Sequence, residues 1–319
     1  MIKRILFATD FSRWARRAED YACTLACSWR ASLTVLSVAE FMPGLNPDYP
    51  VNQQYLADLL KQASSQLVDL KGRAERRGIA VTTRVATGIP SEEVITAARA
   101  EDSDLIVVGT RGKTGLAHVL LGSTAERVIR GAPCPVLTVR TEPADTEQEE
   151  GVLSRPVTLE RILVPVDFSD CSFDALEYAV VVAQQAEASL MLLHVLEPVS
   201  YGLDFTLGHI RTREQVRESW TKRLEELASS HQHPHAPVES RLRGGLPADS
   251  ILDSAQTLPC DLIVMGTHGR RGISHAFSGS VAEAVLRKAR CPVLTVRNPK
   301  FGPGHRRVIP TAMSPVMHT

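Results

Sequence analysis

The chain consists of one unit of sequence repeated twice, and this duplication constrains its fold more than any other feature. Two aspartates 157 residues apart, Asp10 and Asp167, stand in the similar segments ILFATDFS and ILVPVDFS. The same offset aligns residues 104–140 with 261–297, where 23 of 37 positions are identical, and it relates Val38 to Val195, Gly88 to Gly245 and Cys134 to Cys291. Each copy is long enough to bury its own core, so two similar domains are expected rather than a solenoid of short repeats.

The segments between and after the copies differ from them in composition. Residues 141–160, TEPADTEQEEGVLSRPVTLE, are acidic and polar and contain two prolines, which is typical of an exposed connection. The end of the chain after Arg297 contains four prolines and two glycines, which disfavour a long regular element. We therefore predict a first domain over 1–141, a linker over 142–158, a second domain over 159–297 and a C-terminal tail over 298–319.

Charge and cysteine content narrow the class of protein. Lys and Arg number 36 and so do Asp and Glu, which does not favour nucleic acid or an anionic membrane as the main partner. The sequence has no run of about 18 apolar residues and no pattern of a secretory signal peptide. Six cysteines in 319 residues are too few for a disulfide scaffold, so we expect a cytoplasmic protein.

Strand and helix patterns alternate within each copy. In the first copy, strands are predicted near 5–9, 32–38, 79–85, 105–108 and 136–139, and helices after Ser12, over 54–77, from Pro90 and over 123–130. Ser12 is the expected N-cap of the first helix, and Gly78 the expected end of the second. This alternation predicts an α/β fold with a five-stranded parallel sheet in each domain, of strand order 3-2-1-4-5, and helices on both faces.

Two polar or flexible segments meet at one edge of such a sheet. Asp10 follows the first strand and Gly109 follows the fourth, and these neighbouring strands flank the point where the strand order reverses. Open parallel sheets bind ligands at that point, beyond the carboxyl ends of the strands. We therefore expect a ligand crevice there in each copy.

A glycine-rich loop follows the fourth strand in both copies. GTRGKTGLAHVLLGST begins at Gly109, and GTHGRRGISHAFSGSV begins at Gly266. The loop leads into a helix whose first N–H groups favour an anion such as phosphate. A structural reading stays open, because STAE and SVAE match a capping box in which Ser123 or Ser280 caps the helix. The loop matches neither a Walker A sequence nor a dinucleotide fingerprint.

The spacing of the glycines resembles that of the universal stress protein family in its tandem two-domain form. The pattern G-x2-G-x9-G-[ST] is met once by Gly109, Gly112, Gly122 and Ser123, and again by Gly266, Gly269, Gly279 and Ser280. The segments FATDFS and VPVDFS, GIP and GLP, and CPVLTVR in both copies support the resemblance, which covers about 1–140 and 159–297.

The resemblance implies tandem flavodoxin-like (adenine nucleotide alpha hydrolase-like) domains and, for the ATP-binding branch, a nucleotide in each crevice. ATP, ADP or AMP would then be held with Mg²⁺ on the phosphates. The implied contacts in the first copy are Ala8, Thr9, Asp10 and Val38 for adenosine, and Gly109, Arg111, Gly112, Gly122, Ser123 and Thr124 for ribose and phosphate. Those in the second are Pro165, Val166, Asp167, Val195, Gly266, His268, Gly269, Gly279, Ser280 and Val281. Ala8 departs from the proline usual in nucleotide-binding members.

The expected activity is nucleotide binding in a stress response, with no catalytic residues assigned. A slow ATP hydrolase or transferase and a ligand-free scaffold or dimerisation module are the alternatives, since the aspartate is the sole acid that both crevices share. The resemblance also implies that the two copies pair through their last strands, 135–140 and 292–297, about a pseudo-two-fold axis, and that two chains could form a homodimer.

A few other residues could carry chemistry, and each has a simpler structural explanation. Cys23 and Cys27 are four residues apart on a predicted helix, and Cys134 and Cys291 begin the last strands, where small buried side chains are common. His231 to His235 form the segment HQHPH, which could supply zinc ligands but has no cysteine or carboxylate at a recognised spacing. No metal site is therefore assigned.

Overall fold

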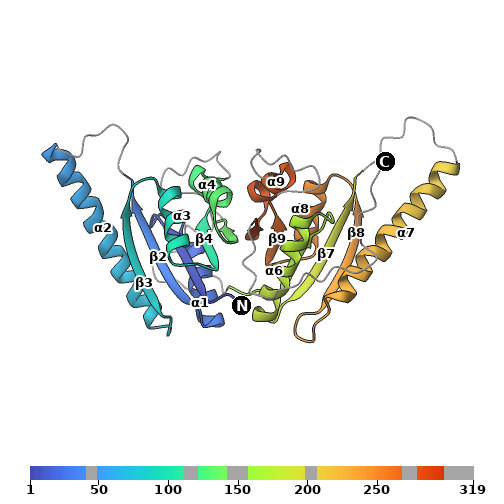
Figure 1. Cartoon of the computed structure of the whole chain (residues 1–319), viewed down its shortest axis with the longest axis horizontal. Coiled ribbons are helices and arrows are strands. Elements are labelled where there is room, and N and C mark those ends of the chain that lie inside the picture. The colour runs from blue at the N-terminus through green and yellow to red at the C-terminus, as the bar shows by residue number, and fades with distance from the viewer. Residues whose placement is uncertain (41–48, 111–120, 142–156, 198–206, 268–278, 298–319) are drawn as a thin grey trace. The chain divides into compact units, whose positions relative to one another are not determined.

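A computed structural model describes residues 1–40, 49–110, 121–141, 157–197, 207–267 and 279–297 (Figure 1). The chain divides into two compact units, Met1–Thr158 with Leu286–Lys300, and Leu159–Val285 with Phe301–Thr319. The last strand of the second copy thus groups with the first unit. The domain and linker boundaries expected from the sequence stay a prediction.

Each copy contains the predicted alternation of strands and helices. The elements of the first are β1 (Arg4–Thr9), α1 (Arg16–Trp29), β2 (Ser32–Ala39), α2 (Pro50–Glu75), β3 (Val81–Thr87), α3 (Pro90–Ala100), β4 (Leu105–Gly109), α4 (Ser123–Gly131) and β5 (Val136–Val139). Those of the second are β6 (Arg161–Pro165), α6 (Asp170–Ala186), β7 (Ser189–Leu196), α7 (Leu207–Ser230), β8 (Val238–Gly244), α8 (Pro247–Thr257), β9 (Leu262–Gly266), α9 (Ser280–Lys288) and β10 (Val293–Val296). Among the described helices, none is long and apolar enough to cross a membrane.

The strand order places β1 in the middle of the first unit. The order there is β3-β2-β1-β4-β5-β10, and β1 runs parallel to both β2 and β4. In the second unit the order is β9-β6-β7-β8, with β6 parallel to β7 and β9. The first five strands thus follow the expected 3-2-1-4-5 order, and the chain reverses direction across the sheet between β1 and β4.

Hydrophobic burial follows from this topology. With this strand order, the right-handed crossovers that parallel strands almost always make require α1 and α2 to lie on one face of the first sheet and α3 and α4 on the other. Within these layers, α2 packs on β2 and β3, and α3 packs on α4. The apolar stretches Leu105–Val108 and Leu262–Met265 are buried throughout, as expected for strands covered on both faces.

The last strands of the two copies pair with each other, as the resemblance implied. Within the first unit, β5 and β10 are antiparallel, with Leu137 opposite Leu294. The Thr138 hydroxyl donates to the Val293 carbonyl at 2.9 Å, and the Thr295 hydroxyl donates to the Val136 carbonyl at 3.2 Å. This pairing covers an apolar edge that would otherwise be exposed. A pseudo-two-fold axis between the copies and a homodimer stay predictions.

Two predicted helix ends are wrong. Ser12 is not an N-cap, because α1 begins at Arg16 after a turn in which Ala15 N–H donates to the Ser12 carbonyl. In the second copy, Ser169 does cap α6 and accepts from Ser172 N–H. Gly78 is not the C-cap of α2, because the helix ends at Glu75 and Arg76 is its C-cap, although Gly78 adopts the left-handed conformation (φ 76°) just beyond it.

Candidate functional site

The carboxyl ends of β1 and β4 lie side by side, as the candidate crevice requires. In the register of these strands, Ala8 is opposite Val108, and on the other side Thr9 is opposite Ser37 of β2. Asp10 follows directly after β1, while Gly109 ends β4 and is opposite Val139. The structure therefore brings together segments about 100 residues apart in sequence.

The aspartate that the two copies share holds a tight turn beyond its strand in each of them. The Asp10 carboxylate accepts from Ser12 N–H at 2.9 Å, and the Asp167 carboxylate accepts from Ser169 N–H at 3.0 Å. Half-buried in each case, the carboxylate is fixed at the edge of the sheet by its own turn. Such a group can accept from a ligand hydroxyl without further ordering.

The residue after each aspartate has an unusual backbone conformation. Phe11 has φ 57° and Phe168 has φ 61°, in the left-handed region that costs a residue with a Cβ about 1–2 kcal/mol. Backbone strain of this kind is concentrated at functional sites. Its presence at the same place in both copies indicates that this turn is more than a connection.

The N-terminus of α4 differs from the capping box expected there. The N-cap is Gly122, no side chain caps the helix, and Ser123 is its first residue. Gly122 N–H donates to the Thr110 carbonyl at 2.7 Å, and the first intrahelical bond runs from Glu126 N–H to the Gly122 carbonyl. The Gly122 amide is thus occupied, and the amides of the following three residues, 123–125, form the open first turn.

The α9 terminus is built in the same way. Gly279 N–H donates to the Thr267 carbonyl at 2.6 Å, and Glu283 N–H donates to the Gly279 carbonyl at 3.0 Å. In both copies, therefore, a hydrogen bond between the residue after the strand and the residue before the helix closes the ends of the glycine-rich loop.

A buried hydroxyl beside this helix terminus points to a polar ligand in the first copy. Thr110 is 3% exposed, and its Oγ1 has no hydrogen-bond partner within the described part of the chain. The Ser12 hydroxyl, in the turn after Asp10, is also buried without a described partner. A buried hydroxyl that makes no hydrogen bond costs about 1–3 kcal/mol. Sequence reasoning missed both hydroxyls, although the identity of Thr110 and Thr267 between the copies was a signal.

Gly266 has a packing role within the second copy, besides the ligand contact that the resemblance implies for it. A Cβ at this position would lie 2.7 Å from the Cys171 Sγ and 2.8 Å from the Cys171 carbonyl oxygen. The glycine therefore allows the first turn of α6 to pack against the end of β9. Close approach of the two elements by itself requires the absence of a side chain here; the proposed contact of Gly266 with a ligand stays a prediction.

This packing predicts the effect of a small substitution. Gly266→Ala is expected to lower the free energy of unfolding by about 1–3 kcal/mol, because the backbone of Cys171 must move. Gly72→Ala is the matched control: its Cβ would meet just the end of the Arg76 side chain, at 3.7 Å, within helix α2. The control is expected to be neutral or up to about 1 kcal/mol more stable. Chemical denaturation measures both, and an equally stable Gly266→Ala variant would contradict this role.

The end of the candidate crevice to which the resemblance assigns adenosine differs between the two copies. In the second, the rings of Phe168, His194 and Trp220 pack together with centroids 4.7–5.2 Å apart, and the Arg223 guanidinium lies 4.5 Å over Phe168. At the 157-residue offset, the first copy has Ser37 in place of His194 and Ala63 in place of Trp220. This difference between the aligned copies was readable from the sequence and was missed.

The remaining candidate residues fall into two groups: those at the strand ends and helix starts where the predicted crevice needs them, and those outside the residues that the structure describes. Val38 is in β2 and Val195 in β7, Pro165 ends β6, and Val166 is 3% exposed. Thr124 and Val281 are in the first turns of α4 and α9. Arg111, Gly112, His268 and Gly269 lie outside the described residues.

The cysteine and histidine candidates do not form a metal site in the part of the chain that the structure describes. No group of three potential ligands is found there. Cys23 is buried, and loss of solvation, with a smaller effect of the Glu19 charge, raises the pKa of its thiol to about 12. His231 is also buried, with its Nε2 3.4 Å from Oε1 of the buried Glu177, so it joins α6 to the end of α7.

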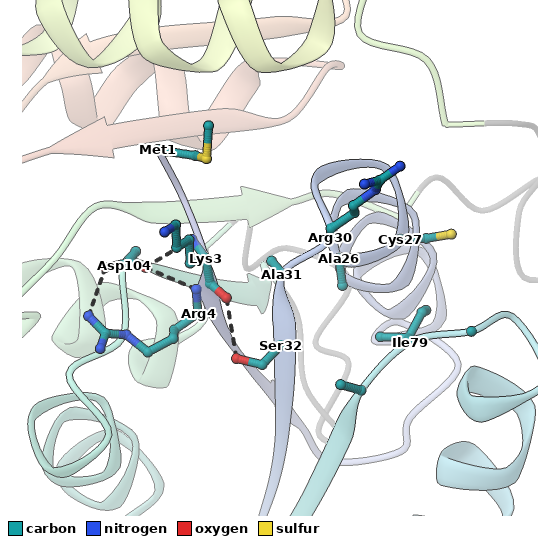
Figure 2. A pocket seen from close by; sticks show the side chains of 12 residues that line it. Met1, Lys3, Arg4, Ala26, Cys27, Arg30, Ala31, Ser32, Ile79 and Asp104 are labelled. Carbon is teal, nitrogen blue, oxygen red and sulfur yellow. Dashed lines mark hydrogen bonds and ion pairs between the residues drawn. The ribbon is translucent and has the colours of Figure 1, made fainter.

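A separate cavity of about 870 Å³ lies at the opposite, amino-terminal edge of the first sheet (Figure 2). Its polar groups stabilise the fold: the Asp104 carboxylate accepts from the N–H groups of Lys3 and Arg4 at 2.9 Å each. In the second copy, Asp261 accepts from the N–H groups of Glu160 and Arg161 in the same way. The shared aspartate is thus explained by structure, and the candidate site remains at the carboxyl edge.

Comparison with known proteins agrees with the duplicated fold. The sequence is 36% identical to a universal stress protein of Methanocaldococcus jannaschii over 141 residues, which are 44% of this chain and 83% of that protein. It is 29% identical over 200 residues to one from Mycobacterium tuberculosis, covering 61% of this chain and 62%, less than two thirds, of that relative. The crystal structure of a universal stress protein from Archaeoglobus fulgidus has the same fold, with a TM-score of 0.65 at 23% identity, over 92% of this chain and 98% of that one.

The match extends to the family as a whole and occurs twice. The sequence pattern of the universal stress protein family matches residues 1–140 and residues 158–297, one match for each copy. The chain therefore belongs to the universal stress protein family and carries the family's domain in tandem.

Proposed function

We propose that this protein binds ATP or a related adenine nucleotide, ADP or AMP, at the carboxyl edge of its sheet and acts as a nucleotide-responsive factor of the stress response in the cytoplasm. One observation carries the proposal: the buried Thr110 hydroxyl without a described partner, beside the open first turn of α4. A phosphate would accept from these amides and from this hydroxyl, and the helix dipole favours its charge. Asp10 would accept from the nucleoside, and any Mg²⁺ would be held by the phosphates.

Binding is favoured over rapid turnover. Phosphoryl transfer needs a group that orients or deprotonates the attacking nucleophile near the terminal phosphate. Asp10, the acid that the resemblance assigns to the crevice, is expected at the nucleoside end, and its carboxylate already holds the turn at Ser12. We expect hydrolysis that is slow at most.

Mass analysis of small molecules released from the denatured, freshly purified chain tests this function. We expect an adenine nucleotide to be released, and a rise in melting temperature when ATP with Mg²⁺ is added to chain stripped of ligand, because a ligand that binds the native state stabilises it. Absence of both signals would favour a ligand-free scaffold. Turnover of about 1–100 s⁻¹, as in kinases, would make the protein an enzyme.

A further inference from the structure

The aromatic cluster of Phe168, His194, Trp220 and Arg223 stands where the second copy would receive the nucleoside. Phe168 directly follows Asp167, and His194 precedes Val195 in β7. The His194 Nδ1 lies 2.6 Å from the carbonyl oxygen of Val166, a residue that the family resemblance assigns to the lining of the adenosine pocket. A side chain of the same copy thus already engages one of the two lone pairs of this backbone carbonyl.

The cluster leaves little ring surface for an adenine to stack upon. Phe168 is contacted by His194, Trp220 and, at 6.1 Å between centroids, Phe173, and the Arg223 guanidinium lies over it. The same guanidinium is 5.2 Å from the Trp220 ring centroid, and His194 is just 5% exposed. Such contacts between rings and with a cation stabilise the cluster itself. It therefore fills the corner instead of offering an open platform.

The first copy lacks this obstruction. Ser37 and Ala63 take the places of His194 and Trp220, although the turn at Phe11 has the same left-handed backbone as the turn at Phe168. Protein interiors are packed to near-crystalline density. The side chains of His194 and Trp220 therefore fill space in the second copy that the smaller side chains of Ser37 and Ala63 leave to other atoms in the first.

The charge of the segment after the turn also differs between the two copies, and this difference too favours nucleotide binding in the first copy. Residues 13–17 of the first copy, RWARR, contain three arginines and no acid. The aligned residues 170–174, DCSFD, contain two aspartates and no cation. These segments directly follow the turn that both copies share. Even with Arg17 paired to Asp20 at 3.9 Å and with Arg223 in the second-copy cluster, the segment is more positive in the first copy, which favours a nucleotide polyphosphate there over the roughly 10 Å within which charges act at moderate salt.

We infer that the two copies are inequivalent and that the nucleotide occupies the first copy alone, while the second is a closed site plugged by its own aromatic cluster. This inference rests on the proposed nucleotide binding and revises the expectation of one nucleotide in each copy. The second copy then contributes packing and the paired strand β10 rather than a ligand site.

Equilibrium dialysis of the full chain against Mg-ATP measures the stoichiometry. We expect one ATP per chain, more than 90% loss of binding in Gly122→Val, and unchanged binding in Gly279→Val, since α9 begins a closed site. Two ATP per chain, with each single variant losing half, would overturn the inference and leave the proposed function intact. No binding to the unaltered chain would instead remove the proposed function.

Photolabelling gives a second measurement that needs no variant. After irradiation with 8-azido-ATP and digestion, mass spectrometry is expected to find label in peptides of residues 1–140 and none above background in residues 158–297. Equal labelling of both copies would overturn the inference. Ser37→His/Ala63→Trp, which places the two large side chains in the first copy, is expected to lower first-copy labelling at least tenfold. Unchanged labelling in that variant, shown to be folded by circular dichroism, would equally count against a plug.

Discussion

Replacement of Gly122 by valine, alone or jointly with Gly279→Val, is expected to abolish nucleotide binding while the chain stays folded. A Cβ at position 122 would lie 3.3 Å from the Thr110 carbonyl oxygen. It would thus stand between Thr110 and the first turn of α4. The two additional methyl groups of valine then extend into the space beside the open amides. A phosphate held by these amides loses its place, so we expect at least a hundredfold weaker binding of ATP by calorimetric titration.

The fold should tolerate this change at modest cost. Gly122 has φ −70° and ψ 148°, which valine adopts without backbone strain, and the hydrogen bond from its N–H to the Thr110 carbonyl can persist. Valine is a poorer N-cap than glycine, at a cost of up to about 1 kcal/mol for each helix. Gly72→Val, in α2 and away from the crevice, is the control and should bind ATP normally. If the glycines serve turns alone, the double variant will lose stability and show no change in nucleotide content.

Replacement of His231 by alanine is expected to destabilise the chain by about 3 kcal/mol. His231 is 7% exposed, its Nδ1 lies 2.9 Å from the Leu227 carbonyl oxygen, and its Nε2 faces the Glu177 carboxylate. The change removes the imidazole from both groups and leaves a cavity between α6 and α7. Removal of one member of a buried polar pair commonly costs several kcal/mol. Urea denaturation measures the loss.

Two further variants separate this pair from a general effect of the HQHPH segment. His235→Ala changes an exposed histidine four residues away and is expected to alter stability by less than about 0.5 kcal/mol. Glu177→Met/His231→Leu replaces both members by apolar side chains and should recover most of the lost stability. If the changes in unfolding free energy of Glu177→Met and His231→Leu alone add up to that of the double variant, the two side chains do not interact. The first copy has Asp20 and the buried Ala74 at these positions, so the pair is a property of the second copy alone.

Local sequence was least reliable at helix starts, even where the two copies share residues. Both copies read DFS after the first strand, yet Ser169 caps α6 and Ser12 does not cap α1. Asp170 follows Ser169 and favours the positive end of a helix, whereas Arg13, Arg16 and Arg17 follow Ser12 and oppose it. The capping box STAE failed for a related reason: Gly122, fixed by the Thr110 carbonyl, took the N-cap position from Ser123.

The sequence by itself determined the duplication, the alternation of strands and helices, the family and the edge of the sheet where the glycine loops and aspartates meet. These follow from periodicity, spacing and repetition, which are properties of the chain read in order. The tertiary structure alone decided that Gly266 accommodates Cys171, that the Gly122 amide is occupied, that the Thr110 hydroxyl is buried without a described partner and that His194 and Trp220 close one corner. Each of these depends on side chains or backbone atoms that are far apart in sequence. Such atoms come close together when the sheet and its helices pack, so their contacts cannot be read from the sequence.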